Sequence, residues 1–178
     1  MGDVPSEETA RDGLFSFLSR RRVAGGGLLA LRGRAPNVEG LRLLDAHEYR
    51  TLQSLVEVML PTTDAIPIDV LPMDLPRAFD DFLADEPEHN IQDLRKALVL
   101  IEFGPLVFDK RVTTFSRLDV EERTEHWNQW ALSDNLLRRQ VSIAMRKFFN
   151  LVYFDHEEVW PYIGYPGPSM KRTQGGTP

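Results

Sequence analysis

Apolar side chains recur at the spacing of an α-helix through most of the chain from residue 45 onward. In the segment 135–154 the apolar positions step by four, three, four and three residues, and two more widen the row to a stripe: Leu137, Val141, Ala144, Phe148, Leu151, Met145 and Val152. The segment 91–103 repeats this pattern at Ile91, Leu94, Leu98 and Ile101. No run of useful length alternates with period two, so the pattern predicts helices and no sheet.

Capping and helix-breaking residues place the ends of the predicted helices. Asp45, followed three residues later by Glu48, forms a capping box, and Asp119 is a second N-cap. Four prolines in the stretch 61–76 predict an irregular surface loop, and Gly164 ends a short last helix. The predicted helices are 45–60, 75–86, 91–103, 119–132, 135–154 and 156–163.

These elements predict an all-α fold, a compact bundle of five to six helices. The chain has 178 residues, which fits one domain with tails. We expect an irregular basic arm over residues 1–44, a helical domain over 45–168 and a flexible tail over 169–178, with a Pro-rich and aromatic stretch at the end of the domain.

Composition narrows the possible functions. The formal net charge is -6, so we do not expect a general binder of nucleic acid or of anionic membranes. The chain contains no Cys, which excludes thiolate nucleophiles, disulfides and Cys-ligated iron–sulfur clusters within it. Redox chemistry would therefore depend on another chain.

Metal-ligating and catalytic patterns are weak. A di-iron bundle needs inward Glu-x-x-His pairs, and only Glu86 and His89 have that spacing, with Pro87 between them. Glu122 and His126 lie four residues apart on one helix face, which favours a solvated surface pair over a two-ligand metal site. No nucleophile elbow, Walker loop or dinucleotide-binding glycine turn is present, so we predict no catalytic, cofactor-binding or metal-binding residue.

Basic and aromatic positions on the two long C-terminal helices have structural interpretations. Arg138 and Arg139 are expected on the solvated surface. The aromatic residues at helical spacing are expected in the core: Trp127, Trp130, Phe148 and Phe149.

The N-terminal region carries a candidate export signal. In SRRRVAGGGLLAL, Ser19 and the three arginines Arg20, Arg21 and Arg22 precede a short apolar, Gly-rich run, which is the layout of a twin-arginine signal. The run is too short to span a bilayer, arginines follow it, and no A-x-A cleavage site is evident. The alternative is a flexible basic arm, so we expect no transmembrane segment in either case.

The stretch 115–168 carries a combination of features seen in one known family. These features are an F-x-x-L start followed by acids, Trp130 before Ser133, an Arg-Arg pair on a long helix, an aromatic helix end and a closing W-x-x-I-G-Y-x-G-P. With them, the chain resembles the gluconate 2-dehydrogenase subunit 3 family. The segment Leu55–Pro61 is similar to the first helix of that family and its break, so the resemblance covers most of residues 45–168.

The resemblance implies a small, non-catalytic subunit without a cofactor of its own. Its partner would be a large FAD-dependent sugar or polyol dehydrogenase of the glucose–methanol–choline type, with electrons leaving through another subunit such as a cytochrome. Small subunits of this family often carry a twin-arginine signal and take the folded catalytic subunit with them, which implies a periplasmic location. A cytoplasmic location is the alternative.

We expect the C-terminal aromatic segment to form the partner interface, because buried aromatic side chains dominate binding energy. The candidate interface residues are Trp160, Tyr162, Ile163, Gly164, Tyr165, Pro166, Gly167 and Pro168. The alternative is that this segment folds back and caps its own core. Two other functions also stay open, a metal-binding helical protein using Glu122, His126 and His156, and a regulatory adaptor for an unrelated protein.

Overall fold

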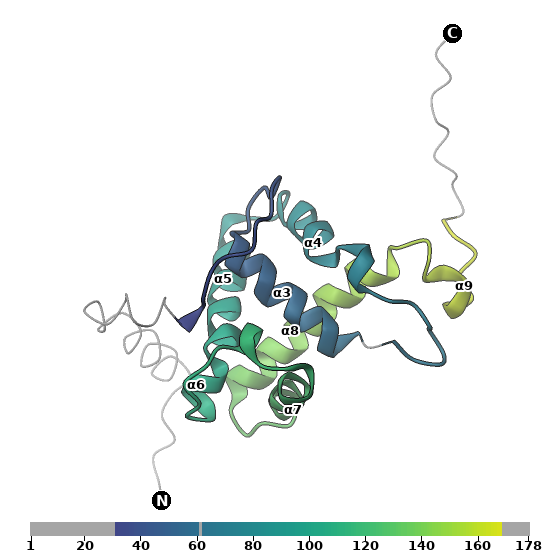
Figure 1. The fold of residues 1–178 in the computed structure, drawn as a ribbon. Helices are drawn as coiled ribbons and strands as arrows, with labels where there is room; N and C mark the ends of the chain where they lie inside the picture. The colour runs from purple at the N-terminus through teal and green to yellow at the C-terminus, as the bar shows by residue number, and fades with distance from the viewer. Residues whose placement is uncertain (1–30, 61, 169–178) are drawn as a thin grey trace, which may run out of the picture. The chain divides into compact units, whose positions relative to one another are not determined.

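A computed structural model describes residues 31–60 and 62–168 of the chain. The contacts divide the chain into two units between Arg34 and Ala35, and the fold below is that of the second unit. Its described residues contain no strand and form seven α-helices and two short 3-10 helices (Figure 1). The elements are α3 (Ala46–Met59), η1 (Leu71–Met73), α4 (Leu75–Leu83), α5 (Glu88–Glu102), α6 (Gly104–Phe108), η2 (Phe115–Arg117), α7 (Val120–Ala131), α8 (Leu136–Phe154) and α9 (Trp160–Ile163). The all-α prediction is thus confirmed.

The predicted caps are present. Asp45 accepts hydrogen bonds from the backbone N–H of His47 and of Glu48, both at 2.8 Å, and the Glu48 carboxylate accepts in return from Asp45 N–H at 2.8 Å. Asp119 accepts from the N–H of Glu122 at 2.8 Å at the start of α7. These bonds satisfy donors that the first helical turn leaves unpaired.

Proline explains two differences between the predicted and the observed helices. The last helix was expected from residue 156, but it begins at Trp160 with Pro161 in its first turn. Pro161 would sit inside the longer helix, where its ring clashes with a carbonyl one turn earlier. A short helix that the sequence did not predict, α6, likewise begins beside Pro105, directly after α5 ends.

The core joins α3 to α4, α5 and α7, and α8 to α4 and α7. Its buried residues include the predicted face of α5 and a stack of Phe79 on Phe149, whose ring centroids are 5.7 Å apart. The predicted stripe of α8 is wrong in part, since Ala144 and Leu151 are exposed. The buried residues of α8 are Val141, Ser142, Met145, Phe149, Val152 and Tyr153.

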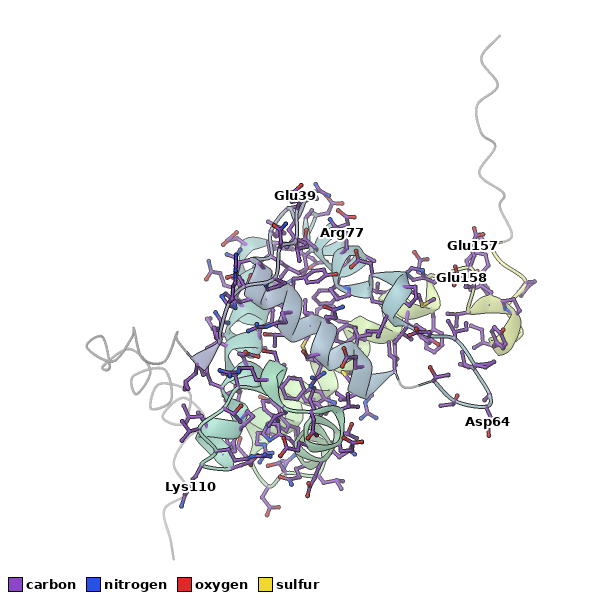
Figure 2. The ribbon with its side chains drawn as sticks, viewed as in Figure 1. Glu39, Asp64, Arg77, Lys110, Glu157 and Glu158 are labelled. Atoms are coloured by element: carbon purple, nitrogen blue, oxygen red, sulfur yellow. The ribbon has the colours of Figure 1, made fainter. Side chains whose placement is uncertain are left out.

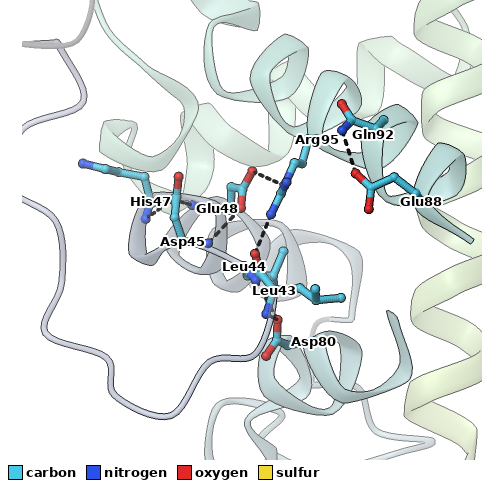
Figure 3. Close-up of polar contacts among 9 residues, drawn as sticks. All are labelled: Leu43, Leu44, Asp45, His47, Glu48, Asp80, Glu88, Gln92 and Arg95. Carbon is cyan, nitrogen blue, oxygen red and sulfur yellow. Dashed lines mark hydrogen bonds and ion pairs between the residues drawn. The ribbon is translucent and has the colours of Figure 1, made fainter. Parts of the chain in front are cut away.

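A polar cluster ties the segment before α3 to the bundle (Figure 3). The buried Asp80 carboxylate on α4 accepts three consecutive backbone N–H groups, from residues 42–44, at 2.5, 3.0 and 2.7 Å. Arg95 on α5 donates to the carbonyl of Leu43 at 2.7 Å and lies 3.5 Å from the Glu48 carboxylate. The domain boundary expected after residue 44 stays a prediction, but residues 42–44 are hydrogen-bonded to the helices.

Candidate partner interface

The C-terminal segment follows the end of α8 through a turn over residues 155–159, which leads into α9 (Figure 1). Val159 in the intervening turn is fully buried and holds the segment on the core. Gly164 ends α9 with a left-handed backbone, φ +67°, and the N–H of Tyr165 donates to the carbonyl of Trp160 at 3.0 Å. This is the glycine-stopped helix that the sequence predicted at this position.

Trp160 fixes the conformation of the segment. Its indole N–H donates to the carbonyl of Phe154 at 3.0 Å, which satisfies an unpaired carbonyl at the end of α8. The Tyr165 ring meets the indole edge to face, with centroids 5.2 Å apart. A Cβ at Gly167, where φ is +91°, would lie only 3.2 Å from the indole, so this glycine lets the chain pass close to the ring.

The side chains around Trp160 point mostly to solvent. Tyr162, Ile163 and Tyr165 are 49%, 43% and 44% exposed. The remaining candidate residues Gly164, Pro166 and Pro168 are also exposed, whereas Trp160 and Gly167 are half-buried. Within the described segment only Val159 joins the core, so the segment presents an ordered apolar surface.

An open groove of about 590 Å³ lies beside this segment, between α4 and the end of α8. Apolar side chains line much of the groove, and Asp155, His156 and Glu157 complete it. Glu157 and Glu158 lie at the turn between α8 and α9 and extend away from the bundle (Figure 2). The surface near α9 therefore combines apolar and acidic groups.

The residues of the metal-binding alternative have other partners. Glu122 forms an ion pair with Arg111. His126 is buried, its Nδ1 lies 2.5 Å from Asp109, and its Nε2 accepts the indole N–H of Trp130 at 3.1 Å. Burial lowers the pKa of His126, and the hydrogen bond to Asp109 opposes that shift. Both ring nitrogens are thus engaged inside the protein, and His126 is neutral with its proton on Nδ1.

His156 lines the groove beside α9 and is not part of the cluster around His126. Glu86 lies in the break between α4 and α5, and His89 lies in the first turn of α5, so the helix is interrupted between them as Pro87 predicted. In the part of the chain that the structure describes, no group of three or more His, Asp or Glu side chains could hold a metal ion.

Sequence reasoning was wrong about the surroundings of Arg138. Its guanidinium lies over the rings of Phe108 and Trp130, at 4.6 and 5.4 Å from their centroids, and burial lowers its pKa. Arg139 donates to the carbonyl of Ser133 at 2.5 Å. The helix that carries Phe108 was not predicted, so this stacking could not be inferred from the residue pattern.

A buried carboxylate was also missed. Glu102 accepts from the hydroxyl of Ser116 at 2.7 Å and from that of Thr51 at 3.1 Å, and so joins η2 and α3 to α5. The position of Glu102 inside the apolar run LVLIEF could have indicated a buried carboxylate, because a charged residue within a buried stripe needs partners inside the protein. These bonds give Glu102 a structural role.

Comparison of the chain with protein-family models, with curated proteins and with solved structures found no match. No helix among the described residues has the length and apolar character needed to span a membrane. The candidate signal at Ser19, Arg20, Arg21 and Arg22 lies outside the described residues. The interface assignment itself stays a prediction.

Proposed function

We propose that this chain is a non-catalytic small subunit that binds and stabilises a large FAD-dependent dehydrogenase of the glucose–methanol–choline type. The FAD and the oxidation of a sugar or polyol belong to that partner, and electrons leave through a further subunit such as a cytochrome. The observation that carries the proposal is the ordered but exposed aromatic segment around α9. The resemblance of residues 115–168 to the gluconate 2-dehydrogenase subunit 3 family supports the choice of partner.

The geometry of α9 favours binding over capping of the chain's own core. The hydrogen bond of the Trp160 indole and its ring contact with Tyr165 hold the segment in place, while Tyr162 and Ile163 remain exposed. Ordered aromatic side chains lose little conformational entropy on binding, which is why they are enriched at the centres of interfaces. The adjoining groove extends the apolar surface toward α4.

Co-expression with a flavoprotein of this type from the same genome tests the proposal. We expect the two proteins to copurify, with the absorbance of bound flavin in the complex, and each to be more soluble than when expressed alone. Truncation after Val159 should abolish copurification, whereas truncation after Pro168, the matched control, should preserve it. Unchanged yield and solubility of both proteins on co-expression would contradict the proposal.

The isolated truncated chain separates binding from core capping. Removing residues 160–178 should lower the free energy of unfolding by no more than about 1–2 kcal/mol, because Val159, the buried residue of the turn, is retained. A loss of stability that matches the loss of association would instead support the core cap. Stoichiometric metal in the purified chain would favour the metal-binding alternative.

The proposal includes export of the partner, with the twin-arginine signal at residues 19–22. Fractionation of cells that express the full chain should then find it on the periplasmic side. Replacing Arg20, Arg21 and Arg22 by Lys should retain it in the cytoplasm, because the signal is read by a receptor that needs the arginine pair. If the variant and the wild type were found in the same cell fraction, export by this signal would be contradicted, whereas binding to the flavoprotein would not be affected.

A further inference from the structure

The long helix α8 carries large apolar side chains on two sides, and on the outer side they alternate with the polar Gln140, Lys147 and Asn150. Its inner side is buried against α4 and α7, as described above. On the opposite side Leu136, Ile143, Leu151 and Phe154 are 39%, 54%, 55% and 40% exposed. We call these four residues the outer stripe of α8.

The outer stripe runs the length of the helix. Ile143 lies about two turns after Leu136, and Phe154 lies about five turns after it, so the three side chains share one face. Leu151 is on the flank of that face, and the exposed Ala144 lies near it. The stripe ends where the carbonyl of Phe154 receives the Trp160 indole, so it continues directly into α9.

The charge of α8 differs from that of the whole chain. The helix carries four basic residues and no acid, in a chain with a net charge of -6. Arg138 and Arg139 serve internal contacts, whereas Arg146 and Lys147 are exposed. Lys147 lies within the outer stripe, four residues from both Ile143 and Leu151, and Arg146 flanks the stripe. Among the described residues no ion pair involves Arg146 or Lys147.

We infer that the outer stripe of α8 is a second part of the docking surface, and that it receives an apolar face of the large flavoprotein subunit with carboxylates opposite Arg146 and Lys147. This inference rests on the proposed function. Apolar burial supplies most of the affinity in such a contact, and complementary charge sets orientation and association rate.

The area of the stripe explains why both parts are needed. A helix of 19 residues is about 28 Å long and about 10 Å wide, so its outer face offers roughly 300 Å². A stable interface buries about 800 Å² on each partner. The outer stripe alone is too small for such an interface, so the rest of the area has to come from neighbouring surfaces, for which the segment around α9 and the groove beside it are the candidates.

Charge disfavours two other occupants of the stripe. In an antiparallel pair of α8 helices, Arg146 and Lys147 near the helix centre would face their own copies, and like charges repel. An anionic membrane would be repelled at the end of the stripe by Asp155, which follows α8 directly, and by Glu157 and Glu158 (Figure 2). A protein partner can instead match both the basic and the acidic part.

Competition for a limiting amount of the flavoprotein tests the inference. Tagged wild type and the variant Ile143→Ser/Leu151→Ser are co-expressed with it, and the ratio of the two small subunits in the purified flavin-containing complex is measured by mass spectrometry. We expect the variant to be incorporated about tenfold less than wild type. The matched control Val112→Ser/Leu132→Ser changes residues that are 78% and 88% exposed elsewhere, and it should compete equally.

A charge reversal gives a second readout. Lys147→Glu should slow association with the flavoprotein about threefold to tenfold at low salt, and high salt should remove most of that difference. Lys96→Glu reverses a comparably exposed lysine on α5 and should change association by less than twofold. Circular dichroism of each variant verifies that the helices are intact.

The possible results separate the inference from the proposed function. Equal incorporation of the stripe variant, while truncation after Val159 abolishes the complex, overturns the inference and leaves the function standing. Absence of any complex with wild type overturns both. A wild-type dimer that the stripe variant loses, or sedimentation with phosphatidylglycerol vesicles that it loses, would assign the stripe to a second copy or to a membrane and overturn the inference.

Discussion

Two tryptophan-centred clusters in this chain use the same residue type in opposite ways. In the inner cluster, Trp130 is fully buried, stacks on Trp127 with centroids 5.3 Å apart, and donates its indole N–H to His126. In the outer cluster, Trp160 is also hydrogen-bonded and packed on a ring, but Tyr162 and Ile163 beside it remain exposed. The inner cluster completes its contacts within the chain, whereas the outer one is ordered and still presents apolar surface.

The difference shows that aromatic content alone does not define a core. Burying an aromatic ring stabilises a fold in proportion to the area removed from water. The inner rings have already gained that free energy on folding. The outer rings can gain it only by binding something else.

The largest expected effect is the loss of the inner tryptophan. Trp130→Ala should lower the free energy of unfolding by about 3–5 kcal/mol, because it opens a cavity and removes the donor that satisfies His126 Nε2. Trp160→Ala should cost about 1–2 kcal/mol, since it removes one hydrogen bond and a half-buried ring. Denaturant unfolding of both variants measures the difference, and equal losses would break the comparison.

A smaller effect is expected from crowding the inner cluster. A Cβ at Gly104 would lie 2.7 Å from Nε2 of His126 and 3.0 Å from the Trp130 ring, so Gly104→Ala should cost about 1–3 kcal/mol. Gly164→Ala in the outer cluster meets no atom within 4 Å, and its cost of about 1 kcal/mol should come from the left-handed backbone alone. Thermal unfolding measures both, and a tolerated Gly104→Ala would mean that the two rings can move apart.

The buried His126 of the inner cluster also predicts that the free energy of unfolding depends on pH. Burial lowers the pKa of His126 in the folded chain below its ordinary value, with Asp109 opposing the shift. His126 therefore binds a proton more readily in the unfolded chain than in the folded one. The stabilising contribution of the neutral, buried His126 is complete above pH 6.5, and it decreases as the pH falls toward the folded-state pKa. His126→Gln should flatten the unfolding free energy measured across this range, and an unchanged pH profile would contradict the assignment.

Helix ends were predictable from the sequence because capping is local. Asp45, Asp119 and Gly164 each act on backbone groups within a few residues of their own position. The same local chemistry correctly predicted the break at Pro87. Proline is compatible with both the end and the start of a helix, and here the prediction was wrong twice. Pro105 was expected to follow a helix end and Pro161 to lie inside a helix, but each lies in the first turn of a helix.

The buried face of α8 was not predictable in the same way. Because the helix carries apolar side chains on both sides, the periodic row through Ala144 and Leu151 fits as well as the row through Met145 and Phe149, which is the buried one. Packing against α4 and α7 decides between them. The candidate interface at α9 was located by its residue pattern, but the outward direction of Tyr162 and Ile163 needed the structure.

The smallest expected effect is the one that most sharpens the comparison. Tyr162→Ala should change the free energy of unfolding of the isolated chain by less than about 0.5 kcal/mol, because the side chain is about half exposed and its ring packs on no other ring among the described residues. The same substitution should weaken copurification with the flavoprotein, since an exposed anchor contributes only when a partner buries it. Unfolding of the isolated variant and its share of the purified complex are measured in parallel. If Tyr162→Ala destabilises the isolated chain as much as Trp160→Ala does, the outer rings serve this chain's own fold and the contrast between the clusters disappears.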